Sequence, residues 1–98
     1  MLTESLNKLM DVLFIIIHEN KDKKVRFNLD GNHVFIQKCG DTELFVTCEG
    51  NTTNSFKIDF RNFSLANYVD FRQFVFVLFC RLAAVIQHDK QNHGRIIR

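Results

Sequence analysis

Residues Tyr68 to Asp89 read YVDFRQFVFVLFCRLAAVIQHD, a run that neither proline nor glycine interrupts. Asn67 precedes it as a favourable N-cap residue, and Asp70 can complete a capping-box-like arrangement near the positive end of the helix dipole. Apolar residues recur along it at spacings of three and four: Phe71, Phe74, Val75, Leu78, Leu82, Val85 and Ile86. The stretch therefore predicts the main helix, around which the rest of the domain packs.

A second set of apolar residues widens this stripe well beyond the width that one sheet face needs: Phe76, Phe79, Cys80, Ala83 and Ala84. A helix that is apolar almost all round must be covered on more than one side. We expect it to pack against a sheet and a second helix, with another subunit as a further candidate.

A first helix is expected from Thr3, a plausible N-cap, to about His18, with Glu4 favourably placed in its first turn. Its apolar residues alternate steps of four and three: Leu2, Leu6, Leu9, Leu13 and Ile16. Two heptads are too few for a free coiled coil, so this pattern favours a helix docked on its own domain. The β-branched run 15–17 weakens helix propensity slightly.

From Val25 the apolar period changes to two, which indicates a strand with one buried face. Asp30-Gly31-Asn32 is a hairpin signal that leads into a second strand, 33–39. A third strand is expected over 42–49 and a fourth around Phe56, Ile58 and Phe60. The sequence thus predicts a two-layer α+β domain of order α-β-β-β-β-α, a four-stranded antiparallel meander with both helices on one face.

The hairpin registers decide which residues share a face. If Asp30-Gly31 alone forms the first turn, Val25, Phe27 and Leu29 lie with Val34 and Ile36; a three-residue loop places them with Phe35 instead. A two-residue Gly40-Asp41 turn in the second hairpin predicts four pairs: Cys39 with Thr42, Lys38 with Glu43, Phe35 with Val46, and His33 with Cys48. In either case apolar residues remain on both sheet faces, which predicts an exposed apolar patch.

Composition predicts one domain over residues 1–98, with 1–2 and 94–98 as frayed ends and Gly94 as the residue where the main helix stops. The formal charge of +2 excludes a strongly basic protein. Three cysteines without a secretory signal favour a reducing, cytoplasmic location, and no run reaches the length of a membrane span. Eleven phenylalanines beside abundant Ile, Asn and Lys suggest an AT-rich genome, as in many viruses and phages.

Motifs for chemistry are weak. Cys39 and Cys48 are too far apart in sequence for a zinc pair, and His33 beside Cys48 lacks a residue to orient a catalytic base. The four glycines are singles at turns or caps and form no phosphate-binding loop. We therefore expect no metal, no cofactor and no enzymatic activity.

The remaining expectation is a small interaction module, dimeric and binding or modulating another protein, such as a viral or plasmid accessory factor. Its predicted interface residues are aromatic: Phe35, Phe45, Phe76 and Phe79. The alternative is a nucleic-acid-binding module that combines exposed sheet aromatics with basic residues near the chain ends: Lys21, Lys23, Lys24, Arg26, Lys90, Arg95 and Arg98.

Overall fold

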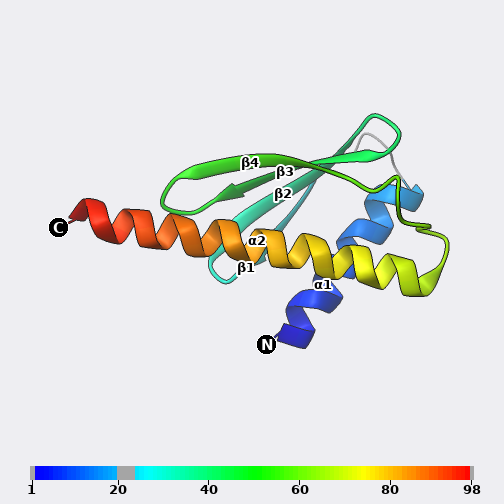
Figure 1. Ribbon diagram of the computed structural model, residues 1–98, viewed down its shortest axis with the longest axis horizontal. Helices are drawn as coiled ribbons and strands as arrows, with labels where there is room; N and C mark the ends of the chain where they lie inside the picture. Colours follow the sequence, from blue (N-terminus) through cyan, green and yellow to red (C-terminus); the bar gives the residue numbers. More distant parts are fainter. Residues whose placement is uncertain (1, 20–23, 98) are drawn as a thin grey trace.

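A computed structural model describes residues 2–19 and 24–97, with side chains for 4–18 and 24–91. The elements follow the predicted order (Figure 1): helix α1 (Leu2–Phe14), a π-helical turn η1 (Ile15–Glu19), strands β1 (Lys24–Leu29), β2 (Asn32–Cys39), β3 (Glu43–Glu49) and β4 (Thr53–Asp59), and helix α2 (Tyr68–Ile97). The strands form one antiparallel sheet in the order β1-β2-β3-β4. The predicted α+β meander is confirmed.

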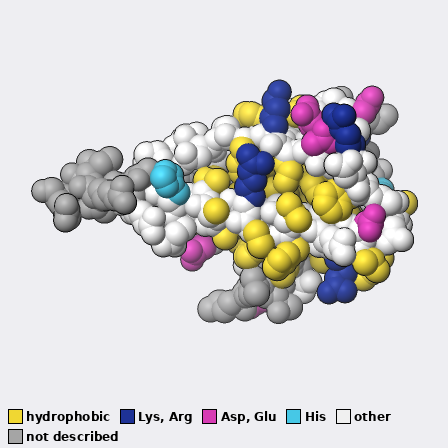
Figure 2. Space-filling model, viewed as in Figure 1, with side chains coloured by type: hydrophobic (Ala, Val, Ile, Leu, Met, Phe, Trp, Pro, Cys, Tyr) yellow, Lys and Arg dark blue, Asp and Glu magenta, His cyan; other side chains and the backbone are white. Residues whose placement is uncertain are grey.

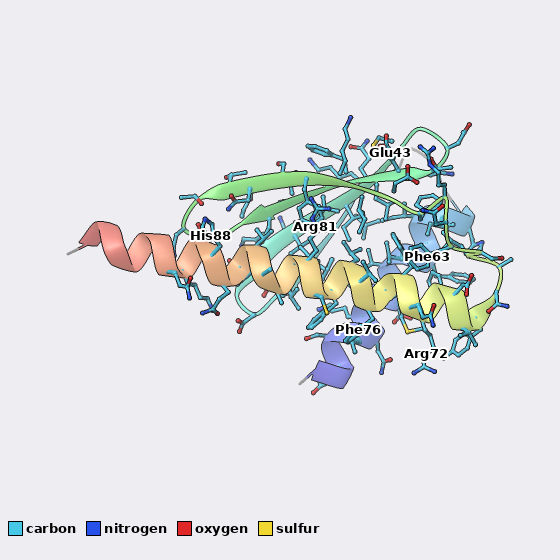
Figure 3. All side chains as sticks on the ribbon, viewed as in Figure 1. Glu43, Phe63, Arg72, Phe76, Arg81 and His88 are labelled. Atoms are coloured by element: carbon cyan, nitrogen blue, oxygen red, sulfur yellow. The ribbon has the colours of Figure 1, made fainter. Side chains whose placement is uncertain are left out.

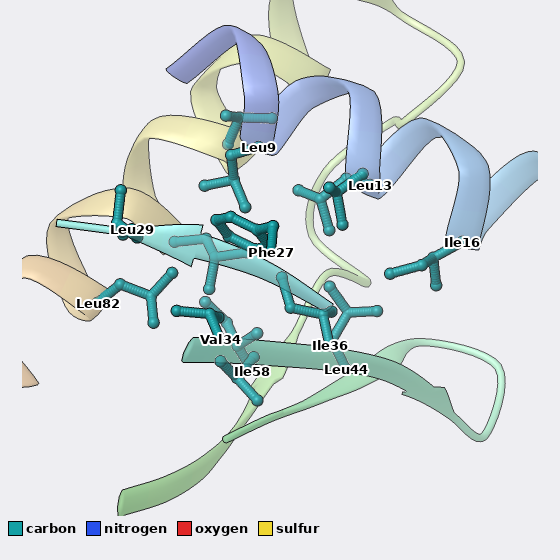
Figure 4. Close-up of a cluster of buried hydrophobic side chains, with 14 of the residues drawn as sticks. Leu9, Leu13, Ile16, Phe27, Leu29, Val34, Ile36, Leu44, Ile58 and Leu82 are labelled. Atoms are coloured by element: carbon teal, nitrogen blue, oxygen red, sulfur yellow. The ribbon is translucent and has the colours of Figure 1, made fainter. Parts of the chain in front are cut away.

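One face of the sheet is buried beneath both helices. Because side chains alternate along a strand, the buried residues lie at every second position: Phe27, Leu29, Val34, Ile36, Leu44, Val46, Cys48 and Ile58. Leu9, Leu13 and Ile16 reach this face from the N-terminal helical segment (Figure 4), and the expected stripe of α2 supplies the second half of the core. The a/d pattern of the first helix therefore docks on its own domain.

The first hairpin has the two-residue turn. Leu29 pairs with Asn32, and Asp30 and Gly31 between them adopt φ values of 53° and 82°. Positive φ at both central positions matches the right-handed twist of the flanking strands. This register places Val25, Phe27 and Leu29 with Val34 and Ile36, so the first of the two open alternatives is confirmed.

The second hairpin differs from the prediction by one residue. Its loop is Gly40-Asp41-Thr42, with Gly40 at a φ of 76°. The predicted pairs of Cys39 with Thr42, Lys38 with Glu43, Phe35 with Val46 and His33 with Cys48 are wrong; the four strand-β2 residues instead face Glu43, Leu44, Thr47 and Glu49. A slip of one residue exchanges the two faces, and the observed register buries Ile36, Val46 and Cys48 together while Phe35 and Phe45 turn to the open face.

Helix α2 begins as expected and ends later. Asn67 Oδ1 accepts hydrogen bonds from the backbone N–H groups of Val69 (2.9 Å) and Asp70 (3.2 Å), so the N-cap is confirmed. Asp70 Oδ2 accepts one from Ser64 N at 2.9 Å rather than from Asn67, which ties the incoming loop to the helix. The predicted stop at Gly94 is wrong, because α2 continues to Ile97; one glycine costs about 1 kcal/mol of helix propensity but does not block helical dihedrals.

The first helix extends to the expected region, but its end is π-helical over Ile15–Glu19. This segment contains the β-branched run, whose side chains crowd a regular α-helical turn. Ile16 stays fully buried, while the exposed Phe14 ring and the His18 ring contact each other in a tilted arrangement with their centroids 4.6 Å apart. The turn thus keeps one isoleucine in the core and leaves an aromatic pair at the surface.

A buried carboxylate fixes the β3–β4 turn to α2. Asp89 Oδ2 accepts a hydrogen bond from Asn51 N at 2.8 Å, and its Oδ1 accepts one from Thr52 N at 3.1 Å and another from the Thr52 hydroxyl. Asp89 is only 7% exposed. Donors that converge on a carboxylate favour its charged form and make it a strong acceptor.

We expect Asp89→Asn to lower the free energy of unfolding by about 2–3 kcal/mol, because the charge-assisted hydrogen bonds are lost and the amide NH₂ faces other donors. Urea denaturation measures this. Asp30→Asn is the matched control, because its carboxylate makes only an exposed ion pair with Lys90 at 3.1 Å and asparagine tolerates positive φ. Equal effects of the two substitutions would contradict the role given to Asp89.

Candidate protein-interaction surface

Exposed large apolar side chains gather at one place on the molecule. Six are found among the described residues: Phe14, Phe45, Tyr68, Val69, Phe76 and Val77. Five of these six line hollows beside α1 and α2, and only Phe45 lies elsewhere. Scattered apolar residues are normal on a protein surface, whereas a contiguous cluster marks an interaction site.

Two adjoining hollows run between the two helices. The larger, about 910 Å³, lies between α1 and the first half of α2 and is lined by apolar residues that include Leu6, Phe63, Val75 and Phe76. The smaller, about 470 Å³, is lined by Phe14, Leu65 and Phe71 among others. Met10 and Tyr68 line both. We call the combined depression the α1–α2 groove.

The groove also has polar lining residues. Arg72 places its guanidinium carbon 5.6 Å from the centre of the Tyr68 ring, a cation–π distance. Asn7 and Gln73 complete the polar lining of the larger hollow, and Asp11 and His18 lie at the smaller one. A mainly apolar lining with a few polar groups suits the burial of another apolar surface.

The side of α2 that faces away from the sheet continues this apolar surface. We define the outer face of α2 by the positions that the helical period places opposite its buried stripe, and all eight are exposed and uncharged: Val69, Gln73, Phe76, Val77, Cys80, Ala83, Ala84 and Gln87. Apolar side chains gather over α2 in Figure 2, and Figure 3 shows Phe76 on the side of the helix toward α1. The α1–α2 groove adjoins this face, because four residues belong to both: Val69, Gln73, Phe76 and Val77.

Arg81 lies on α2 near this face but turns toward β4 (Figure 3). Its Nη1 donates a hydrogen bond of 3.5 Å to the Lys57 carbonyl oxygen, and its guanidinium carbon lies 4.4 Å from the centre of the Phe56 ring. The guanidinium is therefore held against the edge of the sheet, and the outer face keeps its neutral character.

The predicted interface residues do not form one surface. Phe76 lies on the outer face of α2 and is 53% exposed, whereas Phe79 is half-buried and packs against the core. Phe35 and Phe45 lie on the open face of the sheet, opposite the helices. Sequence reasoning also missed four residues of the cluster, Phe14, Tyr68, Val69 and Val77, although the spacing of Val69, Phe76 and Val77 already followed one helix face.

The open sheet face is mixed in charge. Lys24, with its Nζ 4.9 Å from the centre of the Phe35 ring, lies there with Arg26 and Lys57. Asp59 on the same face binds Arg61 through an ion pair of 2.8 Å and accepts a hydrogen bond of 2.7 Å from Arg61 N. These hydrogen bonds, with the guanidinium charge, lower the pKa of Asp59. The face therefore carries aromatic rings but no uniform positive field.

The basic residues proposed for nucleic acid do not converge where the structure describes them. Lys24 and Arg26 lie on the open sheet face, while Lys90 lies near the β1–β2 turn and pairs with Asp30. The other predicted contacts fall outside the described side chains: Lys21, Lys23, Arg95 and Arg98. The single basic surface that this alternative needs is not formed by the described members.

The three cysteines have different environments. Cys48 is buried, and burial, followed by the nearby carboxylates of Asp89 and Glu49, raises the pKa of its thiol. Cys39 is half-buried and Cys80 is exposed, and none of the three is in a disulfide. The considered pair of His33 and Cys48 is split, because His33 lies on the open face and Cys48 in the core.

Within residues 4–18 and 24–91, no group of three or more His, Cys, Asp or Glu side chains is placed to hold a metal ion. Neither helix, over the ranges that the structure describes, combines the length and apolar character needed to cross a membrane.

No family model, curated protein or solved structure matches this chain.

Proposed function

We propose that this protein is a small non-enzymatic protein–protein interaction module that acts as a homodimer, with the outer face of α2 as the contact surface. The observation that carries the proposal is the concentration of exposed apolar side chains on one uncharged helix face beside a groove. The unpaired cysteines suit a reducing cytoplasm. A role as an accessory factor that modulates another protein is part of the same proposal.

The free energy gained by covering this face supports the proposal. Phe76, Val77 and Val69 are each about half exposed, although full burial of such a side chain contributes about 1.5–3 kcal/mol relative to exposure. Because the other side of α2 already packs on the sheet and α1, the gain is available only from outside the domain. An interface is the usual reason for such a patch on a small domain.

A second copy of the chain is the occupant that the charge pattern favours. In a twofold interface the same patch lies on both subunits. A charged residue near the centre of the patch would therefore face the same charge on the other subunit, and this repulsion would oppose association. The positions that face away from the sheet along α2 carry no charge, and the nearest cation, Arg72, lies at the margin of the face against the Tyr68 ring. A partner of different sequence would place no such restriction on this helix.

We expect Phe76→Glu to raise the dimer dissociation constant at least about 100-fold. A central aromatic side chain typically contributes 2 kcal/mol or more to an interface. A glutamate at position 76 would in addition bury one unpaired charge from each subunit in the contact. Sedimentation equilibrium over a range of concentrations measures the change. Circular dichroism checks that the helix content is unaltered, as expected for an exposed position.

Phe45→Glu is the matched control, because Phe45 is also an exposed phenylalanine but lies on the open sheet face. It should leave the dissociation constant within about threefold of the unaltered protein, since surface changes away from an interface are worth about 0.5 kcal/mol. If Phe45→Glu dissociates the dimer and Phe76→Glu does not, the contact surface is the sheet and the proposal is wrong.

A further inference from the structure

We infer that the two α2 helices of the dimer pack antiparallel, with the Cys80 residues of the two copies facing each other near the twofold axis. This inference rests on the proposed function and adds to it the direction and register of the contact. It is carried by the distribution of side-chain size along the outer face.

Large and small residues occupy different halves of this face. Val69, Phe76 and Val77 precede Cys80 on this face, and Ala83 and Ala84, at the middle of α2, follow it. Cys80, a small residue, lies between the two groups. All are exposed, so part of each side chain is free to contact a second copy.

An antiparallel pair centred on Cys80 places Phe76 and Val77, the large residues nearest to it, over small ones, and sets Val69 opposite Gln91. Phe76 meets Ala84 of the other copy, Val77 meets Ala83, and Gln73 meets Gln87, whose amides can hydrogen-bond to each other. Small residues let the two helix axes approach closely, and the Phe76 ring of one copy then fills the space left by the small Ala84 side chain of the other. Antiparallel helix dipoles also attract rather than repel.

The other arrangements pack worse. A parallel pair sets Phe76 against Phe76 and Ala84 against Ala84, so one end collides while the other leaves a gap, and both defects destabilise an interface. An antiparallel pair centred near residues 76 and 77 brings the large residues together, and one centred at Ala83 and Ala84 brings the small ones together. Among these arrangements, the register about Cys80 is the one that sets both Phe76 and Val77 against alanines.

The chemistry of the cysteines makes this register testable. Cys80 is exposed, whereas Cys48 is buried and its pKa is raised, which keeps it a protonated, unreactive thiol at neutral pH. The test uses full-length protein with Cys39→Ser, so that Cys80 is the accessible thiol, and a short bis-maleimide whose two rings each add one thiolate. We expect most of the protein to become a covalent dimer, and Cys80→Ser to abolish this product.

Two further variants determine direction. In a background with Cys39→Ser and Cys80→Ser, a cysteine is introduced as Gln73→Cys in one preparation and as Gln87→Cys in another. The two positions are 14 residues apart, about 21 Å along a helix. We therefore expect little cross-linking in either preparation alone and strong cross-linking when the two are mixed and allowed to exchange subunits.

Three results would contradict the helix direction, the contact surface or the dimer itself. Self-linking of Gln73→Cys and of Gln87→Cys would show parallel helices and overturn the inference. A dimer in solution that links in none of these variants would place the contact on another face, against both the inference and the proposed surface. A monomer at all concentrations would overturn the proposed function itself.

Discussion

Phe74→Ala is expected to lower the free energy of unfolding by about 3–5 kcal/mol, the range for removing a buried phenylalanine side chain. Phe74 is fully buried, and its ring contacts Phe60 edge-on at a centroid distance of 5.8 Å and Phe63 at 5.3 Å. It thus joins α2 to the segment between β4 and α2. The loss is large beside the 5–15 kcal/mol that stabilises a typical domain.

Urea denaturation followed by circular dichroism measures this effect. Phe45→Ala is the control, since the same atoms are removed from a partly exposed ring on the open sheet face; we expect a loss of at most about 1 kcal/mol there. Near-equal losses at the two positions would mean that α2 does not bury Phe74 against the sheet, and the layer arrangement would be wrong.

Gly50→Ala is expected to cost about 2–3 kcal/mol, because the added methyl group has no space. A Cβ at this position would lie 2.2 Å from Asn32 Oδ1 and 2.9 Å from Asp89 Oδ2. Neither atom can easily move away. The Asn32 amide nitrogen donates hydrogen bonds to the carbonyl oxygens of Asp30 (3.1 Å) and Leu29 (3.4 Å), and the Asp89 carboxylate is held by Asn51 and Thr52.

Asn32→Ala in combination with Gly50→Ala tests this cause. If the clash with the Asn32 amide is responsible, Gly50→Ala should cost at least 1 kcal/mol less in the Asn32→Ala background, a coupling that a double-mutant cycle on urea denaturation measures directly. Gly31→Ala is a control of a different kind: nothing lies within 4 Å of its Cβ, and its φ of 82° adds only backbone strain. Independent effects at Gly50 and Asn32 would contradict the steric account.

The order of elements was predictable because each pattern was local. The period of two from Val25, the Asp30-Gly31 turn and the uninterrupted run after Asn67 each specify an element through neighbouring residues. The register of the second hairpin was not predictable from local sequence, because Gly40-Asp41 and Gly40-Asp41-Thr42 are both acceptable loops. The choice is made by burial of Val34, Ile36, Val46 and Cys48 on one face, which depends on the whole sheet.

The sequence predicted that an exposed apolar surface exists, but it did not predict where on the molecule that surface lies. The excess of apolar residues on 68–89 correctly indicated that the sheet and α1 would leave part of the helix uncovered. The apolar character expected on both sheet faces followed from the wrong register, and with the observed one the open face keeps Phe35 and Phe45 among charged residues. The contribution of Phe14 and Tyr68 depends on how α1 crosses α2, which no local pattern encodes.

The solution mass of the unaltered protein, measured by light scattering on a sizing column at low and high salt, tests the central claim most directly. Burial of a neutral apolar helix face predicts twice the 11.5 kDa mass of one chain at both salt concentrations, since such contacts are not weakened by salt. A mass of one chain at the highest concentration that stays in solution would contradict the account, and α2 would then be a helix whose outer face stays in water.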